Sequence, residues 1–378
     1  MKFVFIGLIG IAAADIYIWC TFLRRRDGLW KWLHWMPLLI LSAAILFGPT
    51  SMAGWFIMTA LITAIFFPQG VFAMISAAGK IVGGKSAIAN KISHITALSC
   101  SGIVAAMALY GLIFGWRHIV VRNIGIPFKN LPESFDGYRI AHLSDLHVGT
   151  FDEAPGTMDR IVEKVNALSP DLILFTGDIV NLTPDELKPY MRVLSSLKAP
   201  DGVYSVLGNH DYCGYMRYST PDGQENAIKK VISLERECGM DLLLNENRII
   251  HHGKDSIALI GVENDGLPPF PERGDLVKAQ TGLPDGIFKI LMSHDPTHWR
   301  RKVLPDTGID LTLSGHTHAM QFRIGNFSPS KFIYREWGGL YSEGQRKLFV
   351  STGTGGNIAF RWGAWPEIDV LTLRKENQ

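Results

Sequence analysis

The 378-residue sequence predicts a helical membrane region followed by a mixed α/β domain. Three observations support this fold class. Residues 32–79 contain no Asp, Glu, Lys or Arg. Residues 1–116 carry eight Lys and Arg against two Asp and Glu, whereas residues 117–378 carry 29 against 33. In the second part, short apolar runs alternate with helical periodicity, as in βα units. We therefore expect a membrane region at 1–116, a polar linker at 117–137 and an α/β domain at 138–378.

The first part is long enough for four membrane-spanning helices. A single helix over residues 32–79 would measure about 70 Å against a hydrocarbon core of about 30 Å, so the chain must turn within it. Pro49-Thr50-Ser51 is the expected turn. The four expected spans are Phe3–Leu23, Leu33–Gly48, Met52–Ile75 and Ile95–Trp116. Because Arg24-Arg25-Arg26 follows the first span, we expect a retained anchor rather than a cleaved signal peptide.

The basic residues of the loops predict the orientation in the membrane. Arg24-Arg25-Arg26 and Lys31 follow the first span, and Lys80, Lys85 and Lys91 follow the third. The positive-inside rule places both loops in the cytoplasm. With four spans, the large domain then lies outside the cytoplasm, an orientation that Arg117, Arg122 and Lys129 oppose. We expect Asp15, the one acidic residue in a span, to face the interior of the helices.

Hydrophobic periodicity predicts the elements of the α/β domain in order. We expect strands at 138–144, 171–176 and 203–207, with a helix through 158–168 and another after the capping box at Thr183-Pro184-Asp185-Glu186, whose start Pro189 shifts later. Two crossovers of about 31 residues predict that the sheet begins parallel. Five later strands are expected at 257–262, 288–292, 311–313, 348–351 and 368–373.

Composition excludes two classes of function. The second part is slightly acidic and lacks the basic surface of a nucleic-acid-binding protein. Cys20, Cys100, Cys213 and Cys238 lack the spacing of a metal site, and only Cys213 and Cys238 could form a disulfide.

Side chains of metal-ligand type follow five of the expected strands. The segments are Asp145-Leu-His147, Gly177-Asp178, Gly208-Asn209-His210-Asp211, His294-Asp295 and Gly315-His316-Thr-His318. A single strand-end Asp is more often a turn or helix cap, but loops at the carboxyl ends of parallel strands converge on one crevice. Imidazole, carboxylate and amide ligands without thiolate suit Mn, Fe or Zn. Four His, two Asp and one Asn at these strand ends make seven candidate ligands. Seven are too many for one tetrahedral ion and fit two ions that share a ligand. Strand alternation or surface position accounts for His142, His251, His252 and His298, which we expect not to be ligands.

The motifs D-L-H, G-D-I-V-N, G-N-H-D, S-H-D-P and G-H-T-H, in this order, resemble the calcineurin-like metallophosphoesterase superfamily over about residues 138–374. The resemblance implies a four-layer α/β/β/α sandwich with a dinuclear centre. It implies that Asp145, His147 and His318 bind one ion, that Asn209, His294 and His316 bind the other, and that Asp178 bridges both. His210 would be the general acid, oriented by Asp211 or by Asn181. The expected catalytic residues are thus His210 and Asp211, and the expected cofactors are two Mn, Fe or Zn ions, with Mn favoured.

This centre predicts hydrolysis of a phosphodiester or phosphomonoester by a metal-bridged hydroxide, with His210 protonating the leaving oxygen. The stretch STGTGGNIAFRWGAWPEIDVLTL resembles the bacterial membrane-associated phosphodiesterase branch of the superfamily, which implies a bacterial envelope enzyme. With the four expected spans, we expect a multi-pass protein of the inner membrane. Gly353, Gly355 and Gly356 in this stretch could approach a phosphate. The loops at 212–218 and 268–271 could line a pocket for a lipid-linked phosphoester, or could be ordinary loop packing.

Two other functions remain open at this point. One is a UDP-2,3-diacylglucosamine pyrophosphatase of lipid A synthesis, which would require a cytoplasmic active site. The other is a non-enzymatic membrane scaffold, against which the complete set of seven ligands counts. The oligomeric state does not follow from the sequence.

Overall fold

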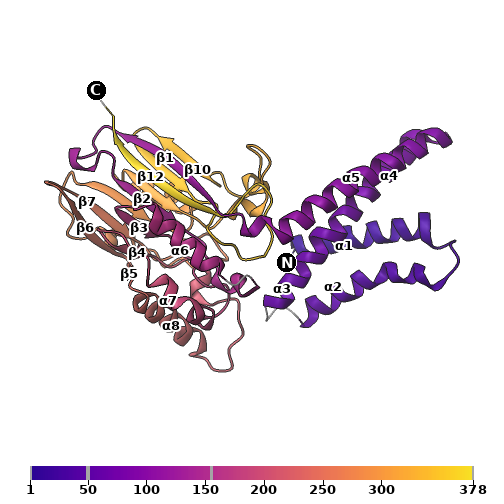
Figure 1. Cartoon of the computed structure of the whole chain (residues 1–378), viewed down its shortest axis with the longest axis horizontal. Coiled ribbons are helices and arrows are strands. Elements are labelled where there is room, and N and C mark those ends of the chain that lie inside the picture. The colour runs from indigo at the N-terminus through magenta and orange to yellow at the C-terminus, as the bar shows by residue number, and fades with distance from the viewer. Residues whose placement is uncertain (1, 48–51, 154–155, 377–378) are drawn as a thin grey trace. The chain divides into compact units, whose positions relative to one another are not determined.

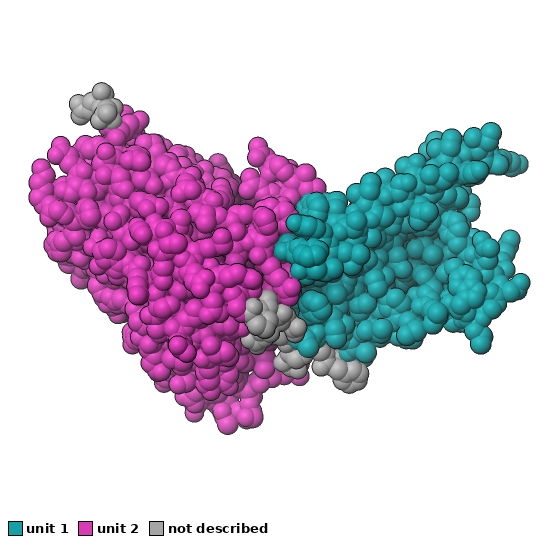
Figure 2. All heavy atoms as spheres, viewed as in Figure 1, with its two compact units in different colours: residues 1–115, 358–362 teal, residues 116–357, 363–378 magenta. Residues whose placement is uncertain are grey.

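The computed structural model describes residues 2–47, 52–153 and 156–376, and these residues form two compact units. Unit 1 comprises 1–115 with 358–362, and unit 2 comprises 116–357 with 363–378 (Figure 2). Residues 358–362 belong to unit 1 because they pack on its last helix, where the Arg361 amide donates a hydrogen bond to the Gly111 carbonyl (3.3 Å). We describe each unit by itself.

Unit 1 is built of apolar helices (Figure 1). They are α1 (Lys2–Ile18), α2 (Met36–Phe47), α3 (Met52–Leu61), α4 (Phe67–Gly83) and α5 (Ala87–Ile113). A π-helical turn at Ile62–Phe66 joins α3 and α4 into one continuous helix. Two local features form the turn between α4 and α5. Gly84 ends α4 with a φ of 51°, and the Ser86 side chain caps the start of α5 by accepting a hydrogen bond from the Ala89 amide.

Three helical stretches of the described residues are long and apolar enough to cross a membrane: Leu29–Leu46, Ala53–Gly83 and Ala87–Arg117. A shorter apolar helix covers Gly7–Leu23. The last two stretches extend beyond the predicted spans Met52–Ile75 and Ile95–Trp116, because the helices continue past the charge-free residues. The predicted turn at Pro49-Thr50-Ser51 lies outside the described residues, as does the Gly48 end of its span. Asp15 is buried, as expected, with Oδ1 3.7 Å from His34 Nε2.

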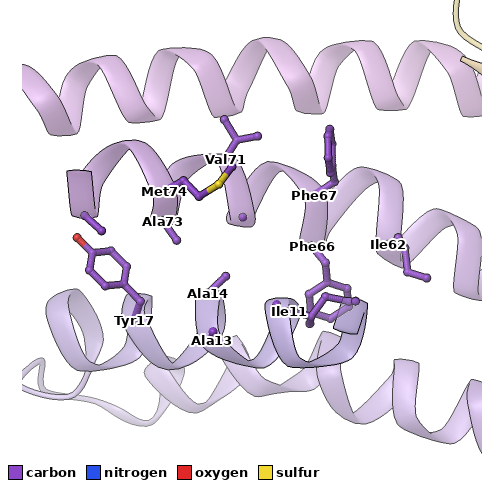
Figure 3. A pocket seen from close by; sticks show the side chains of 14 residues that line it. Ile11, Ala13, Ala14, Tyr17, Ile62, Phe66, Phe67, Val71, Ala73 and Met74 are labelled. Carbon is purple, nitrogen blue, oxygen red and sulfur yellow. The ribbon is translucent and has the colours of Figure 1, made fainter. Parts of the chain in front are cut away.

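A cavity of about 560 Å³ lies between α1 and the continuous α3–α4 helix (Figure 3). Its walls are mainly small and apolar residues, among them Gly10 and Ala14 of α1 and Gly70 and Ala73 of α4. Tyr17 contributes the one polar side chain among the lining residues. This cavity therefore offers no set of ligands for a metal or a phosphate.

Unit 2 contains two six-stranded sheets (Figure 1). The first sheet has the order β1 (Val120–Phe128), β12 (Glu367–Lys375), β2 (Arg139–Leu143), β3 (Leu172–Phe175), β4 (Val203–Ser205) and β5 (Asp241–Leu242). The second has the order β10 (Gly339–Glu343), β11 (Arg346–Val350), β9 (Leu311–Ser314), β8 (Phe288–Met292), β7 (Asp255–Gly261) and β6 (Glu246–His252). Strands β2, β3 and β4 are parallel, which confirms the prediction from the two crossovers.

The stretch 117–137, predicted to be a polar linker, contains strand β1. This strand pairs in parallel with β12 over nine residues, and its Ile126 and Phe128 are buried. The alternation of Ile124, Ile126 and Phe128 was a strand signal within the charged stretch. The linker prediction is therefore corrected: nine of these 21 residues form the edge strand of the first sheet.

One hydrophobic core joins the inner faces of the two sheets. It includes Ile140 and Leu174 from the first sheet and Leu259, Ile290 and Leu313 from the second. A second cluster, with Trp299 and Val303, covers the other face of the second sheet. The helices of unit 2 are α6 (Thr157–Ala167), α7 (Met191–Leu194), α8 (Gly223–Glu237), α9 (Leu276–Ala279) and α10 (Leu304–Asp306).

The helical predictions for this unit are partly confirmed. Helix α6 lies where the periodicity placed it, and the capping box at Thr183 is present. That box opens a 3₁₀ segment, Pro184–Tyr190, and α7 begins only after Pro189. Helix α8 was not predicted, although Ala227, Ile228, Val231 and Leu234 recur at helical spacing.

Candidate metal centre

The strand-end motifs of both sheets meet in unit 2. Asp145 and His147 follow β2, Asp178 follows β3, and Asn209 and His210 follow β4, all in the first sheet. His294 follows β8, and His316 and His318 follow β9, in the second sheet. Five of these residues adopt a positive φ: Asp145, His147, Asp178, His316 and His318, at 54°, 47°, 60°, 72° and 49°. The chain therefore turns sharply as it leaves the strands.

Glycines permit this close approach of the loops. A Cβ at Gly208 would lie 2.2 Å from Asp178 Oδ1, and a Cβ at Gly315 would lie 2.2 Å from Asp145 Oδ2. Gly355 comes equally close, because its Cβ would meet the Leu146 carbonyl oxygen at 1.8 Å. The amides of Thr354 and Gly355 donate to the Ser144 and Asp145 carbonyls (2.8 and 3.0 Å). The glycine-rich turn thus supports the Asp145 loop, and these two amides are used there rather than on a phosphate.

Six of the seven predicted ligands form two groups of ligand atoms that share a member. Asp145, His147, Asp178 and His318 lie within 4.8 Å of one another, and so do Asp178, His294 and His316. Asp178 belongs to both groups. Its Oδ2 lies 3.6 Å from His147 Nε2 and 3.1 Å from His294 Nε2. All six residues are buried.

The seventh predicted ligand, Asn209, lies at the second group. Its Oδ1 is 2.7 Å from His316 Nδ1, and its amide Nδ2 donates to the Tyr215 hydroxyl (2.8 Å). The structure therefore brings all seven side chains together. His142, His251, His252 and His298 belong to neither group.

Backbone hydrogen bonds determine which imidazole nitrogens face the cluster. His147 Nδ1 donates to the Val180 carbonyl (3.1 Å), and His294 Nδ1 donates to the Thr176 carbonyl (2.6 Å). Nε2 then presents a lone pair toward the cluster in the neutral ring of His147, and would do so in His294 once a cation displaces the proton from its Nε2. Metal-binding histidines are commonly oriented by such a bond from the other nitrogen.

The cluster has an excess of electron-pair donors. Burial lowers the pKa of His147 to about 3 and that of His316 to about 4, so both rings are neutral. His147 Nε2 and His318 Nε2 are 3.3 Å apart, and His318 Nε2 is 3.3 Å from Asp145 Oδ1. Within the described residues, no Lys or Arg forms an ion pair with Asp145 or Asp178. This donor set fits divalent cations, which would neutralise the two buried carboxylates.

The pKa of His294 also reflects the negative charge of the two buried carboxylates. Burial lowers its pKa, but the charges of Asp178 and Asp145 outweigh this effect and raise the pKa to about 10. The carboxylates that hold a proton on this ring would also attract a cation.

His210 lies at the edge of the first group. Its Nδ1 donates to the Asn181 carbonyl (2.7 Å), and its ring centroid is 4.7 Å from that of His147. The Tyr215 ring packs against the His210 ring, with centroids 4.4 Å apart and ring planes inclined by 33°. The bond to Asn181 leaves Nε2 as the nitrogen that can reach a substrate.

Asp211, expected to be catalytic, has other partners. Its carboxylate accepts hydrogen bonds from four backbone amides, those of Asp178 (2.7 Å), Ile179 (2.9 Å), Val180 (3.3 Å) and Gly208 (2.8 Å). It is fully buried and ties the loop after β3 to the loop after β4. Of the two residues considered for orienting His210, the structure shows the contact with Asn181, through its backbone carbonyl.

Aromatic side chains border the cluster. Phe270 meets His316 edge to face at 4.6 Å, and the Tyr334 hydroxyl is 2.9 Å from His316 Nε2. Burial raises the pKa of Tyr334 to about 12, so the phenol is neutral, and its hydroxyl shares this hydrogen bond with His316 Nε2. Tyr215 and Phe270 lie in the two loops singled out from the sequence. Tyr334 was missed, because nothing local marks it as a neighbour of His316.

The cysteines take no part in the cluster. All four are free thiols in the structure, so the considered Cys213–Cys238 disulfide is absent from the described residues. Burial raises the pKa of Cys213 to about 12 and that of Cys238 to about 11.

Comparison with known proteins identifies the family. Residues 138–320 match the family model described as calcineurin-like phosphoesterase. The chain is 30% identical to the metallophosphoesterase YkuE of Bacillus subtilis over 257 residues. The aligned region covers 65% of this chain and 82% of YkuE. The chain belongs to the calcineurin-like phosphoesterase family. Its membership indicates phosphoester hydrolase activity and agrees with the buried Asp and His cluster.

Two further relatives of this phosphoesterase are informative. The transmembrane protein with metallophosphoesterase domain of Danio rerio is 29% identical over 320 residues, covering 81% of this chain and 69% of that protein. Its name pairs the same two parts, and together with the apolar helices it supports a membrane protein. The UDP-2,3-diacylglucosamine pyrophosphatase LpxG of Chlamydia trachomatis is 27% identical over 297 residues, covering 64% of this chain and 86% of that protein.

Proposed function

We propose that this phosphoesterase hydrolyses a phosphodiester or phosphomonoester with two divalent cations. Asp145, His147 and His318 would hold one cation, Asn209, His294 and His316 would hold the other, and Asp178 would be shared. The observation that carries the proposal is the position of Asp178, whose Oδ2 lies within 3.6 Å of a histidine Nε2 from each group. Mn²⁺ is our favoured ion, with Fe and Zn as the other candidates.

When bound, two divalent cations would activate a water molecule and neutralise charge on the phosphoryl oxygens. The residues of the chain supply the remaining functions. His210 protonates the leaving oxygen through Nε2, while the Asn181 carbonyl holds its Nδ1–H and so fixes the ring. The Asp211 carboxylate holds the loops that carry Asp178 and Asn209 and acts as a positioning residue.

We also propose a specific architecture for the chain. The two sheets and their shared core are compatible with a four-layer α/β/β/α sandwich over 138–378, extended by β1 from the segment 117–137. In the region 1–116, α1 with its π-helical extension covers residues 2–23, a helix of about 33 Å, which would suffice for a fourth span. Four spans and the loop charges would place the domain outside the cytoplasm, in a bacterial inner membrane.

The substrate we favour is a phosphoester presented at the membrane surface, which could be lipid-linked. Hydrolysis of UDP-2,3-diacylglucosamine is the second candidate, and the similarity to LpxG supports it. A reporter fused at Gln378 separates the two, because a reporter that is active only outside the cytoplasm excludes the lipid A reaction. A non-enzymatic scaffold is disfavoured by the complete set of seven ligands.

The catalytic proposal is tested with the full chain in detergent micelles. We expect about two Mn ions per chain and turnover of bis-p-nitrophenyl phosphate. His210→Gln should keep both metals and lose on the order of a hundredfold or more in rate. Asp178→Asn should lose metal and activity together. His251→Gln changes an exposed histidine on β6 and serves as the matched control.

Each variant has an outcome that would contradict its assigned role. A His210→Gln protein as active as the wild type removes His210 from the mechanism. Parallel loss of metal and rate in this variant would make His210 a ligand. If Asp178→Asn keeps both metals, the shared-ligand arrangement is wrong.

A further inference from the structure

The segment 316–335, which follows β9, exposes apolar side chains beside the metal centre. Phe332 and Ile333 are 76% and 65% exposed, and Met320, Ile324 and Phe327 are also exposed. Phe327 and Phe332 contact each other edge to face, with ring centroids 6.1 Å apart. Several large apolar side chains gathered on one exposed segment are typical of an interaction surface rather than of scattered surface residues.

The same segment is basic. It contains Arg323, Lys331 and Arg335 and no Asp or Glu. Lys331 Nζ lies over the rings of Phe327 and Phe332, 4.7 and 5.4 Å from their centroids, so cation and apolar surface are adjacent. The next residue, Glu336, is buried and bonds to Arg300 (2.6 Å), with Arg335 at 3.6 Å.

The segment is held firmly to the metal centre at both ends. His316 and His318 open it, and Tyr334 near its end hydrogen-bonds back to His316 Nε2 (2.9 Å). Between them, the Ser328 hydroxyl donates to the Ala319 carbonyl (2.6 Å), and Ile324 and Phe327 exchange two backbone hydrogen bonds. The apolar tips are therefore presented by an ordered structure and not by a loose loop.

We propose that the segment 316–335 docks on the anionic headgroups of a lipid bilayer, with Phe332 and Ile333 inserted among the lipids. Apolar side chains flanked by cations, without acidic residues, match the chemistry of that surface. The chain carries apolar helices of spanning length, so a bilayer is always close to this domain. Docking would bring phosphoesters embedded in the bilayer to the centre formed with His316 and His318, while hydrolysis of a soluble ester would not need it.

The test measures lipid contact directly and does not depend on catalysis. In a background with Cys20→Ala and Cys100→Ala, Phe332→Cys is labelled with the fluorophore NBD, since the two remaining thiols are buried. The full chain is placed in nanodiscs of phosphatidylglycerol and brominated phosphatidylcholine. The matched control is Val277→Cys, an isolated apolar residue on α9 that is 83% exposed.

We expect brominated lipid to quench the label at 332 at least about twofold relative to unbrominated lipid, with little quenching at 277, because only inserted groups meet the acyl chains. Equal quenching at both positions, or none at 332, would overturn the proposal. If instead the 332 label in micelles becomes shielded from water as the protein concentration rises, the segment contacts a second copy of the chain. That result would also overturn the proposal.

The charges are tested in the same labelled protein. Lys331→Glu with Arg335→Glu should reduce the quenching at 332 about twofold or more, as should replacing phosphatidylglycerol by a neutral lipid. If neither the charge reversal nor the neutral lipid changes the quenching at 332, recognition of anionic headgroups is excluded. Hydrolysis of bis-p-nitrophenyl phosphate should stay unchanged in this variant, so failure of docking is distinguishable from failure of the catalytic proposal.

Discussion

Replacing Asp211 by asparagine tests whether this residue positions loops or acts on His210. One carboxylate oxygen accepts from the amides of Ile179 and Val180, and the other accepts from those of Asp178 and Gly208. In asparagine, one oxygen becomes an NH₂ group, so two buried backbone amides lose their acceptor. Each unsatisfied donor costs about 1–3 kcal/mol, which gives a loss of about 2–6 kcal/mol for the α/β domain.

The loss should be visible in urea unfolding of the full chain in micelles, followed by the transition of the α/β domain. Metal content and turnover of bis-p-nitrophenyl phosphate should fall with it, because Asp178 and Asn209 lie on the loops that Asp211 holds. Asp185→Asn is the matched control: its side chain is 72% exposed and pairs with Lys188, so the change should cost at most about 0.5 kcal/mol.

One result would refute this reasoning. If Asp211→Asn unfolds at the wild-type urea concentration and keeps its metals but loses turnover, the carboxylate acts on the reaction through His210. The original expectation of a catalytic Asp211 would then be restored.

Three further predictions concern other parts of unit 2. Burial lowers the pKa of His142 to about 3, so the unfolded chain takes up its proton first as the pH falls. This residue should therefore decrease the unfolding free energy by about 1.4 kcal/mol per pH unit as the pH falls from about 6 to 4. His142→Gln should remove this part of the pH dependence. An unchanged pH dependence in the variant would contradict the prediction. Gly355→Ala should lower metal content and turnover, since the new Cβ would meet the Leu146 carbonyl oxygen at 1.8 Å. In the control Gly308→Ala the new Cβ meets nothing within 4 Å, so metal content and turnover should stay unchanged. Cys213 and Cys238 should react with maleimide at pH 8 only after unfolding, because burial raises the pKa of both thiols; fast labelling of the folded chain would show that they are accessible.

The sequence by itself determined those features whose signals are local. Charge-free runs marked the apolar helices, and short apolar runs marked β2, β3 and β8. Polar residues at the strand ends identified all seven side chains that meet at the centre. Each of these signals depends on a residue and its near neighbours along the chain.

Only the tertiary structure decided which groups support that centre. The Asn181 carbonyl that holds His210, the Tyr334 hydroxyl on His316 and the turn at Gly355 beneath Asp145 all come from distant parts of the chain. Strand β1 likewise pairs with β12, so that Val120 lies opposite Glu367. Such contacts have no local pattern, because they form only when the packing of two sheets brings backbone groups of separate loops within hydrogen-bonding distance.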